Sequence, residues 1–300
     1  MTVRTVIGVD IGGTKISVAR VGESIEGEVL TAPTPRGPRA ILATVVELSR
    51  IAAGSLPFAG IGVGSAGTFD PSGRVTHATA LLPGWTGTRV AGALTEAFGV
   101  PAVALNDVHA AALAESQRGA GNGFSRVLAT TVGTGVGGAF VHDGIVDVGR
   151  TGSAGSIGHI RVIGIERECS CGAVGHVEAV ASGPGMERTF VELGGASIGL
   201  REIGELARAG DEIARAAIEA GGTALGRGLA VAAALYDPGV IVIGGGVAEL
   251  GELLFDKTIS VYQAESLRLV HDVQVRPAML GVTATIVGGA LAIQRSLYIP

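Results

Sequence analysis

The feature that most constrains the fold is a pattern that occurs once in each half of the chain. Residues 5–22, TVIGVDIGGTKISVARVG, have the pattern of an apolar strand, a turn at Gly12 and Gly13, and a second strand with alternating residues. Residues 125–146, SRVLATTVGTGVGGAFVHDGIV, repeat this order with different residues. Two glycine-bent hairpins predict two duplicated α/β domains.

The remaining segments are consistent with such domains. Helical patterns cover residues 38–54, 89–100, 108–121, 200–209, 211–235 and 284–297, and patterns of buried strands cover 59–67, 101–107 and 238–246. Glycine contributes 50 of 300 residues, well above its usual share of roughly 7%, which indicates tight strand connections and backbone close to ligands. We expect a small N-terminal domain from residues 1–108 plus 284–300 and a large C-terminal domain from residues 109–283.

Charge and hydropathy exclude several classes of protein. The net charge of −5 and the absence of charge runs argue against a nucleic-acid partner. The N-terminus lacks the layout of a signal peptide, and no stretch of 18 apolar residues suits a membrane span. These observations predict a soluble, cytoplasmic protein.

Three glycine-rich turns, DIGGTK, VGTGVGG and VIGGGVA, are candidates for binding phosphate, because backbone N–H groups at a tight turn form a concavity for anions. Lys15 leads into a strand rather than a helix, so the first turn is not a Walker loop, and no Rossmann fingerprint opens a helix. A single such turn is more often a plain hairpin. The combination is more specific, since Asp10 can hold magnesium through water and Thr14 can donate a hydroxyl to phosphate.

The chain resembles the ROK family of bacterial sugar kinases and repressors. The motifs that carry the resemblance occur in family order and are GVDIGGTK (8–15), ALNDVHAAALAE (104–115), VGTGVGG (132–138), GSAGSIGH (152–159), CSCGAVGHVEA (169–179) and IVIGGGV (241–247). The resemblance implies an α/β protein with two actin-like (ribonuclease H-like) domains and a nucleotide and sugar cleft between them. It also implies ATP and Mg²⁺ as cofactors, phosphorylation of a sugar on its 6-hydroxyl, and a homo-oligomer, most often a dimer.

By matching position, Asp107 resembles the catalytic base, because a carboxylate can orient a sugar hydroxyl and accept its proton. Its structural alternative is an N-cap for the helix at 108–118. The resemblance further implies sugar contacts from Gly67, Asn106, Asp107, Ser156, His159 and Glu178. The implied cofactor-binding residues are Asp10, Gly12, Gly13, Thr14, Lys15, Thr131, Gly133, Thr134, Gly135, Gly244, Gly245 and Gly246.

Two departures from the family pattern bear on the substrate. Ser156 stands where most members have a glutamate that contacts the sugar near C1 and C2, and Leu81 replaces a polar residue before PGW. A pocket that loses hydrogen-bonding groups discriminates differently among sugars. Bacterial N-acetylmannosamine kinases also tend to lack that glutamate, so we expect an N-acylated hexosamine, with N-acetylmannosamine first.

Other functions remain open at this point. A glucokinase is the nearest alternative. A non-catalytic sugar-sensing regulator is a second, although the first hairpin begins within ten residues of the start and leaves no room for a helix-turn-helix ahead of it. An actin-like filament or chaperone ATPase is a third, and it gives no reason for the cysteine loop.

Both cysteines of the chain lie in ECSCGAVGHVEA, residues 168–179. In a reducing compartment such a pair is more often metal-binding or redox-active than a structural disulfide, and cysteines one residue apart bridge with strain. The resemblance implies a structural zinc site from His159, Cys169, Cys171 and His176, in which His176 replaces the family's third cysteine. Two thiolates and two imidazoles are a common tetrahedral zinc set. We expect this zinc to hold Glu178 in place.

Overall fold

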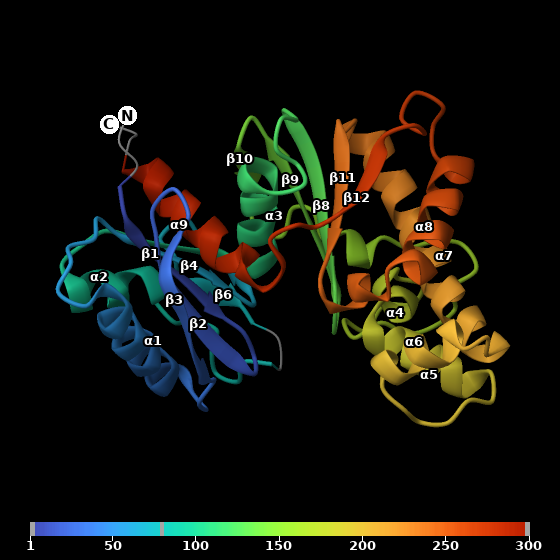
Figure 1. Ribbon diagram of the computed structural model, residues 1–300, viewed down its shortest axis with the longest axis horizontal. Coiled ribbons are helices and arrows are strands. Elements are labelled where there is room, and N and C mark those ends of the chain that lie inside the picture. The colour runs from blue at the N-terminus through green and yellow to red at the C-terminus, as the bar shows by residue number, and fades with distance from the viewer. Residues whose placement is uncertain (1–3, 79–80, 298–300) are drawn as a thin grey trace. The chain divides into compact units, whose positions relative to one another are not determined.

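The computed structural model describes residues 4–78 and 81–297 and divides into two compact units (Figure 1). Unit 1 comprises Met1–Gly119, Gly144–Ala154 and Val282–Pro300, and unit 2 comprises Ala120–Asp143 and Gly155–Gly281. The expected boundary after residue 108 would cut helix α3 (Asp107–Arg118) from unit 1. The structure keeps this helix there, because α3 packs along the C-terminal helix α9 (Ala284–Ser296).

Unit 1 contains a five-stranded sheet of order β3-β2-β1-β4-β7. The first hairpin supplies β1 and β2, which pair antiparallel with Asp10 opposite Ser17, while β4 and β7 continue the sheet parallel to β1. The strands are β1 (Val6–Ile11), β2 (Lys15–Val21), β3 (Ile25–Pro33), β4 (Ile61–Ser65) and β7 (Ala102–Asn106). Because β1, β4 and β7 are parallel, their C-terminal ends share one edge of the sheet.

Helices cover both faces of this sheet (Figure 1). Both faces need cover because successive side chains along β1 point to opposite faces and nearly all of them are buried. Ile7, Val9 and Ile11 point into a core with Ile41 and Val45 of α1. Val6 belongs to a second cluster with residues of α9. The remaining elements of this unit are α1 (Pro38–Ala53), α2 (Val90–Phe98) and the short strands β5 (Thr68–Phe69) and β6 (Val75–His77).

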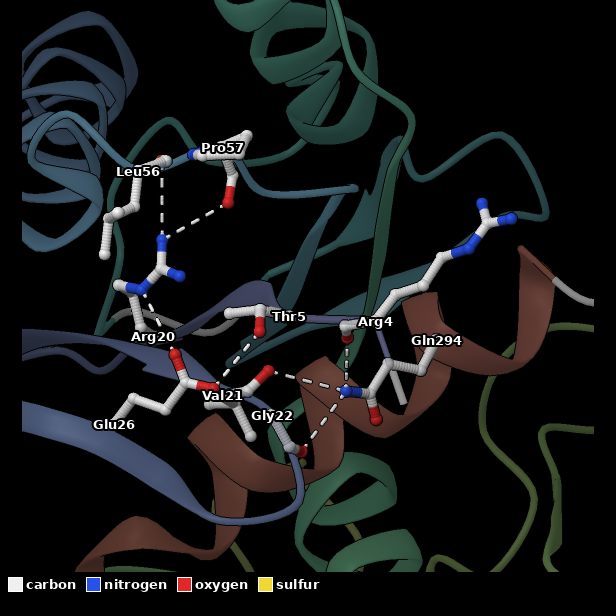
Figure 2. Close-up of polar contacts among 9 residues, drawn as sticks. All are labelled: Arg4, Thr5, Arg20, Val21, Gly22, Glu26, Leu56, Pro57 and Gln294. Carbon is white, nitrogen blue, oxygen red and sulfur yellow. Dashed lines mark hydrogen bonds and ion pairs between the residues drawn. The ribbon is translucent and has the colours of Figure 1, made fainter. Parts of the chain in front are cut away.

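A polar contact joins α9 to the first hairpin (Figure 2). The side-chain amide of the buried Gln294 donates to the carbonyl oxygens of Arg4, Val21 and Gly22, at 2.9, 3.4 and 3.3 Å. Arg118 of α3 also donates to the Gly22 carbonyl, at 3.0 Å. These bonds give side-chain donors to three backbone oxygens at the ends of the hairpin, and they tie the last helix to the first two strands.

Unit 1 depends on small residues where α9 crosses the sheet. A Cβ atom on Gly62 of β4 would lie 1.7 Å from the carbonyl oxygen of Gly289, and one on Gly288 would lie 1.7 Å from that of Ala110. Both neighbours are backbone atoms, which cannot rotate away. The small residues of the last helix therefore let it approach both β4 and α3.

We expect Gly62→Ala to destabilise the protein by about 1–3 kcal/mol or more, because the new methyl group forces α9 away from β4. Chemical denaturation measures the free energy of unfolding. Gly92→Ala is the matched control, since its nearest neighbour is the mobile end of exposed Arg89 and alanine favours the helix interior. Equal stability of the two variants would contradict the packing of α9 described above.

The second sheet repeats the topology of the first, with the order β10-β9-β8-β11-β12. Its hairpin strands β8 and β9 pair antiparallel, and β11 and β12 continue the sheet in parallel. The strands are β8 (Arg126–Val132), β9 (Val136–His142), β10 (Ile145–Asp147), β11 (Val240–Gly244) and β12 (Gln274–Pro277). The prediction of duplicated α/β domains is confirmed, with a hairpin and two parallel strands in each.

A large apolar cluster fills unit 2 between its sheet and its helices. The long helix α7 packs along α8 and also contacts α5 and α6. The helices and helical turns are α4 (Glu178–Ala181), α5 (Gly183–Glu192), α6 (Leu200–Arg208), α7 (Glu212–Tyr236), α8 (Glu252–Glu265), η1 (Ile157–His159), η2 (Gly246–Leu250) and η3 (Gly281–Thr283). None of the helices in residues 4–78 and 81–297 combines the length and apolar character needed to cross a membrane.

Candidate functional site

The first glycine turn closes the β1–β2 hairpin and presents Gly13, Thr14 and Lys15 at the surface. The Gly12 N–H donates to the Lys15 carbonyl at 3.0 Å. Thr34, just after β3, makes two hydrogen bonds to the turn. Its N–H donates to the Thr14 carbonyl at 2.9 Å, and its hydroxyl donates to the Gly12 carbonyl at 2.7 Å. The sequence reasoning missed Thr34, because no motif marks a residue that acts on a turn 20 residues earlier.

Two carboxylates lie at the edge where β1 and β7 end. Asp10 is near the end of β1, and its pKa is raised to about 7, mostly by burial and also by the charge of Asp107, while Lys15 lowers it. Asp107 begins α3, and burial raises its pKa against the opposing hydrogen bond from the Val108 N–H. Two half-buried acids that repel each other are a natural site for a cation or for proton transfer.

The structure assigns the helix cap to Asn106 rather than to Asp107. The Asn106 side-chain oxygen accepts hydrogen bonds from the N–H groups of Val108 and His109, at 2.9 and 3.2 Å. Its amide nitrogen donates to the Gly67 carbonyl at 2.9 Å. The alternative of Asp107 as N-cap is therefore wrong, because Asp107 is already the first helical residue. Its carboxylate accepts a hydrogen bond from the Val108 N–H at 3.0 Å.

His109, two residues after Asp107, makes a structural contact. It is buried, and its Nε2 atom lies 2.9 Å from the Ala154 carbonyl oxygen. Burial lowers its pKa, so the ring is neutral near pH 7 and donates a proton to that oxygen. The contact fixes the glycine-rich segment that ends at Ala154.

The second glycine turn joins β8 to β9 and contacts Glu178. The Gly133 N–H donates to the Gly135 carbonyl at 2.8 Å, and Thr134 is exposed at the tip. The Val136 N–H donates to Glu178 Oε2 at 3.0 Å. A Cβ atom on Gly135 would lie 2.6 Å from the same oxygen. Gly135, which is predicted to bind the nucleotide, and Glu178, which is predicted to contact the sugar, are therefore neighbours within unit 2.

The third glycine segment follows β11 and lies at the same edge of the second sheet. Gly244 is the register partner of Thr131 in β8. Gly245 has φ +89°, and a Cβ atom on it would lie 2.3 Å from the Val132 carbonyl oxygen. Gly246 begins η2, and a Cβ atom on it would meet no neighbouring atom. Only glycine fits at position 245, where the chain turns sharply against β8.

His159, Cys169, Cys171 and His176 form a cluster in which one ligand atom of each lies within 4.8 Å of the others. The Cys169 Sγ atom is 3.8 Å from His159 Nδ1, and the Cys171 Sγ atom is 3.3 Å from His176 Nδ1. Tetrahedral zinc, with bonds of about 2.3 Å to sulfur and 2.0–2.1 Å to nitrogen, separates such atoms by roughly 3.3–3.8 Å. The residues therefore fit a zinc ion, and both thiols are free.

Ser156 and Leu81, the two departures from the family pattern, are both exposed. Ser156 precedes η1, and its carbonyl accepts the His159 N–H at 3.0 Å. Leu81 lies beside the first glycine turn, since a Cβ atom on Gly13 would be 3.1 Å from the Leu81 Cβ. Ser156 is thus next to a candidate metal ligand, and Leu81 is next to a candidate phosphate-binding turn.

Comparison with known proteins agrees with this arrangement. The model of the ROK family matches residues 6–296. A glucokinase of Streptomyces coelicolor is 32% identical over 95% of this chain and 96% of its own length, and a kanosamine kinase of Amycolatopsis mediterranei is 32% identical over 94% and 93%. The crystal structure of a ROK family glucokinase from Streptomyces griseus with glucose and AMPPNP is 31% identical, with a TM-score of 0.83 over 97% of this chain and 99% of that one.

These matches define a class of protein with two actin-like domains, and the two units have that fold. The chain belongs to the ROK family.

Proposed function

We propose that this protein is an ATP-dependent sugar kinase that transfers a phosphoryl group to the 6-hydroxyl of a hexose or N-acylhexosamine. The observation that carries the proposal is the half-buried carboxylate of Asp107 at the first position of α3. A base whose pKa is raised toward neutrality accepts a hydroxyl proton more readily than an ordinary aspartate. Asp107 orients the sugar hydroxyl and takes its proton as the oxygen attacks the phosphorus.

The remaining residues divide between phosphate and sugar. Asp10 would help to hold Mg²⁺, and the ion would favour the ionised carboxylate against the burial that raises its pKa. The two hairpin turns, with Thr14 and Thr134, and the glycines that follow β11 contact the nucleotide through backbone N–H groups. Asn106 and Glu178 contact the sugar, with Gly67, Ser156 and His159. The Asn106 amide donates to the Gly67 carbonyl and also hydrogen-bonds to Asp107, which fixes its side chain beside the base.

The cysteine loop holds structural zinc in this proposal. His159, Cys169, Cys171 and His176 supply two thiolates and two neutral imidazoles, a set that balances the charge of Zn²⁺. Four protein ligands leave no open coordination position, so the ion has no part in the chemistry. It fixes the loop that leads into Glu178.

N-acetylmannosamine is the sugar that the sequence departures favour. Ser156 provides a shorter side chain than the glutamate of most members, and Leu81 removes a polar group. Both changes lower the number of hydrogen-bond partners that would select glucose. Glucose is the alternative, because relatives 30–32% identical to this chain are named glucokinase. A dimer and a cytoplasmic location are part of the same proposal.

A coupled ADP-release assay with glucose, N-acetylglucosamine and N-acetylmannosamine tests the substrate. We expect the largest kcat/KM with N-acetylmannosamine. A clear preference for glucose would overturn this choice and leave the kinase in place. No turnover with any of the sugars, together with measurable sugar binding, would instead indicate a sugar-sensing regulator.

A further inference from the structure

Both oxygens of the Glu178 carboxylate have donors in unit 2, and the donors come from different loops. The Ser170 hydroxyl, between the two cysteines, donates to Oε1 at 2.6 Å. The Cys169 thiol lies 3.4 Å from the same oxygen. On the other side, the Val136 N–H donates to Oε2 at 3.0 Å.

Ser170 is the residue of the cysteine loop whose hydrogen bond to Glu178 does not depend on metal binding. A cysteine that ligates a metal has lost its proton and has none to donate, so the contact of Cys169 with Glu178 is not a hydrogen bond in the metal-loaded protein. The serine hydroxyl keeps its proton in either state. Its bond to a carboxylate is charge-assisted and short, the kind that fixes a side chain in one orientation.

We propose that Ser170 is a positioning residue that sets the orientation of the Glu178 carboxylate. Through this one carboxylate the cysteine loop is connected to the second glycine turn, at Val136 and Gly135. The inference rests on the proposed function, in which Glu178 accepts a hydrogen bond from the sugar. Each carboxylate oxygen accepts more than one hydrogen bond, so both oxygens remain available after their protein contacts.

Ser170→Ala removes the hydroxyl and leaves the metal ligands in place. We expect the KM for the sugar to rise about tenfold, as is typical when a residue that supports a binding group is lost, while the KM for ATP and the zinc content are unchanged. Ser170→Thr keeps the hydroxyl and is expected to restore the sugar KM. Ser125→Ala, an exposed serine before β8 at the end remote from the glycine turn, is the control.

Glu178→Gln, measured alongside, separates this inference from the proposed function. An impaired Glu178→Gln with a normal Ser170→Ala would overturn the role of Ser170 and leave that of Glu178. A normal Glu178→Gln would overturn both, since there would be no sugar contact to position. Loss of zinc from Ser170→Ala, or a threonine variant no better than the alanine variant, would show that Ser170 only maintains the loop.

Discussion

Asp107→Asn is expected to lower kcat by roughly 10²–10⁴-fold, the range that general base catalysis contributes. The amide has the shape of the carboxylate and its oxygen can still accept the Val108 N–H, but it cannot take a proton from the sugar. The KM for the sugar is expected to change little by comparison. Steady-state measurement of ADP release, with Mg²⁺ and sugar saturating, gives the effect.

The structure supports reading such a loss as chemical rather than structural. Asn106, not Asp107, caps α3, so the helix keeps its cap in the variant. Asp237→Asn makes the same chemical change at an exposed position with φ +48°, where asparagine is well tolerated, and serves as the control. Unchanged turnover in Asp107→Asn would contradict the proposed mechanism.

Replacement of His176 is expected to have the second large effect. His176→Ala removes one of four ligands, and we expect zinc affinity to fall by more than roughly 100-fold, because even outer-shell partners of metal ligands are worth about 10- to 100-fold. The thermal midpoint should fall as well, since metal binding stabilises the folded loop. Metal analysis of the purified protein and a thermal scan measure the two quantities.

His176→Cys is the matched variant, because it restores a third thiolate in place of the imidazole. We expect it to retain zinc, since three thiolates and one histidine are also a common structural set. One equivalent of zinc in the native and cysteine variants, and little in the alanine variant, would agree with the site. Native protein that purifies without zinc, or an alanine variant that retains it fully, would contradict it.

Much of the fold follows from patterns in the sequence, and the exceptions have physical reasons. The two hairpins and helix α9 show clear periodicity, because one face of each packs on a core. β3 was not predicted, since all of its side chains are partly or fully exposed at a sheet edge, and Ile25 and Val29 pack only in part against an apolar cluster. The short strand β12, with no fully buried residue, was missed for the same reason.

The residues of the candidate site also fall into two groups, those that sequence motifs identify and those that only the folded structure reveals. Motifs identified the residues that we propose contact ligands directly, such as Asp107 and the four members of the cysteine–histidine cluster. They could not identify Thr34 or Ser170, because the partners of these two residues are set by folding. They also named Asp107 instead of Asn106 as the candidate helix cap, because either side chain suits that position and only the backbone geometry distinguishes them.

The most direct test of the account is to identify the product formed from ATP and N-acetylmannosamine with Mg²⁺ present. Phosphorus NMR of the reaction distinguishes phosphate on the 6-hydroxyl from phosphate on the anomeric oxygen or in solution. We predict a sugar 6-phosphate in equal amount to ADP, and its loss in Asp107→Asn. ADP formed with free phosphate alone, or phosphate on the anomeric oxygen, would contradict the proposed function.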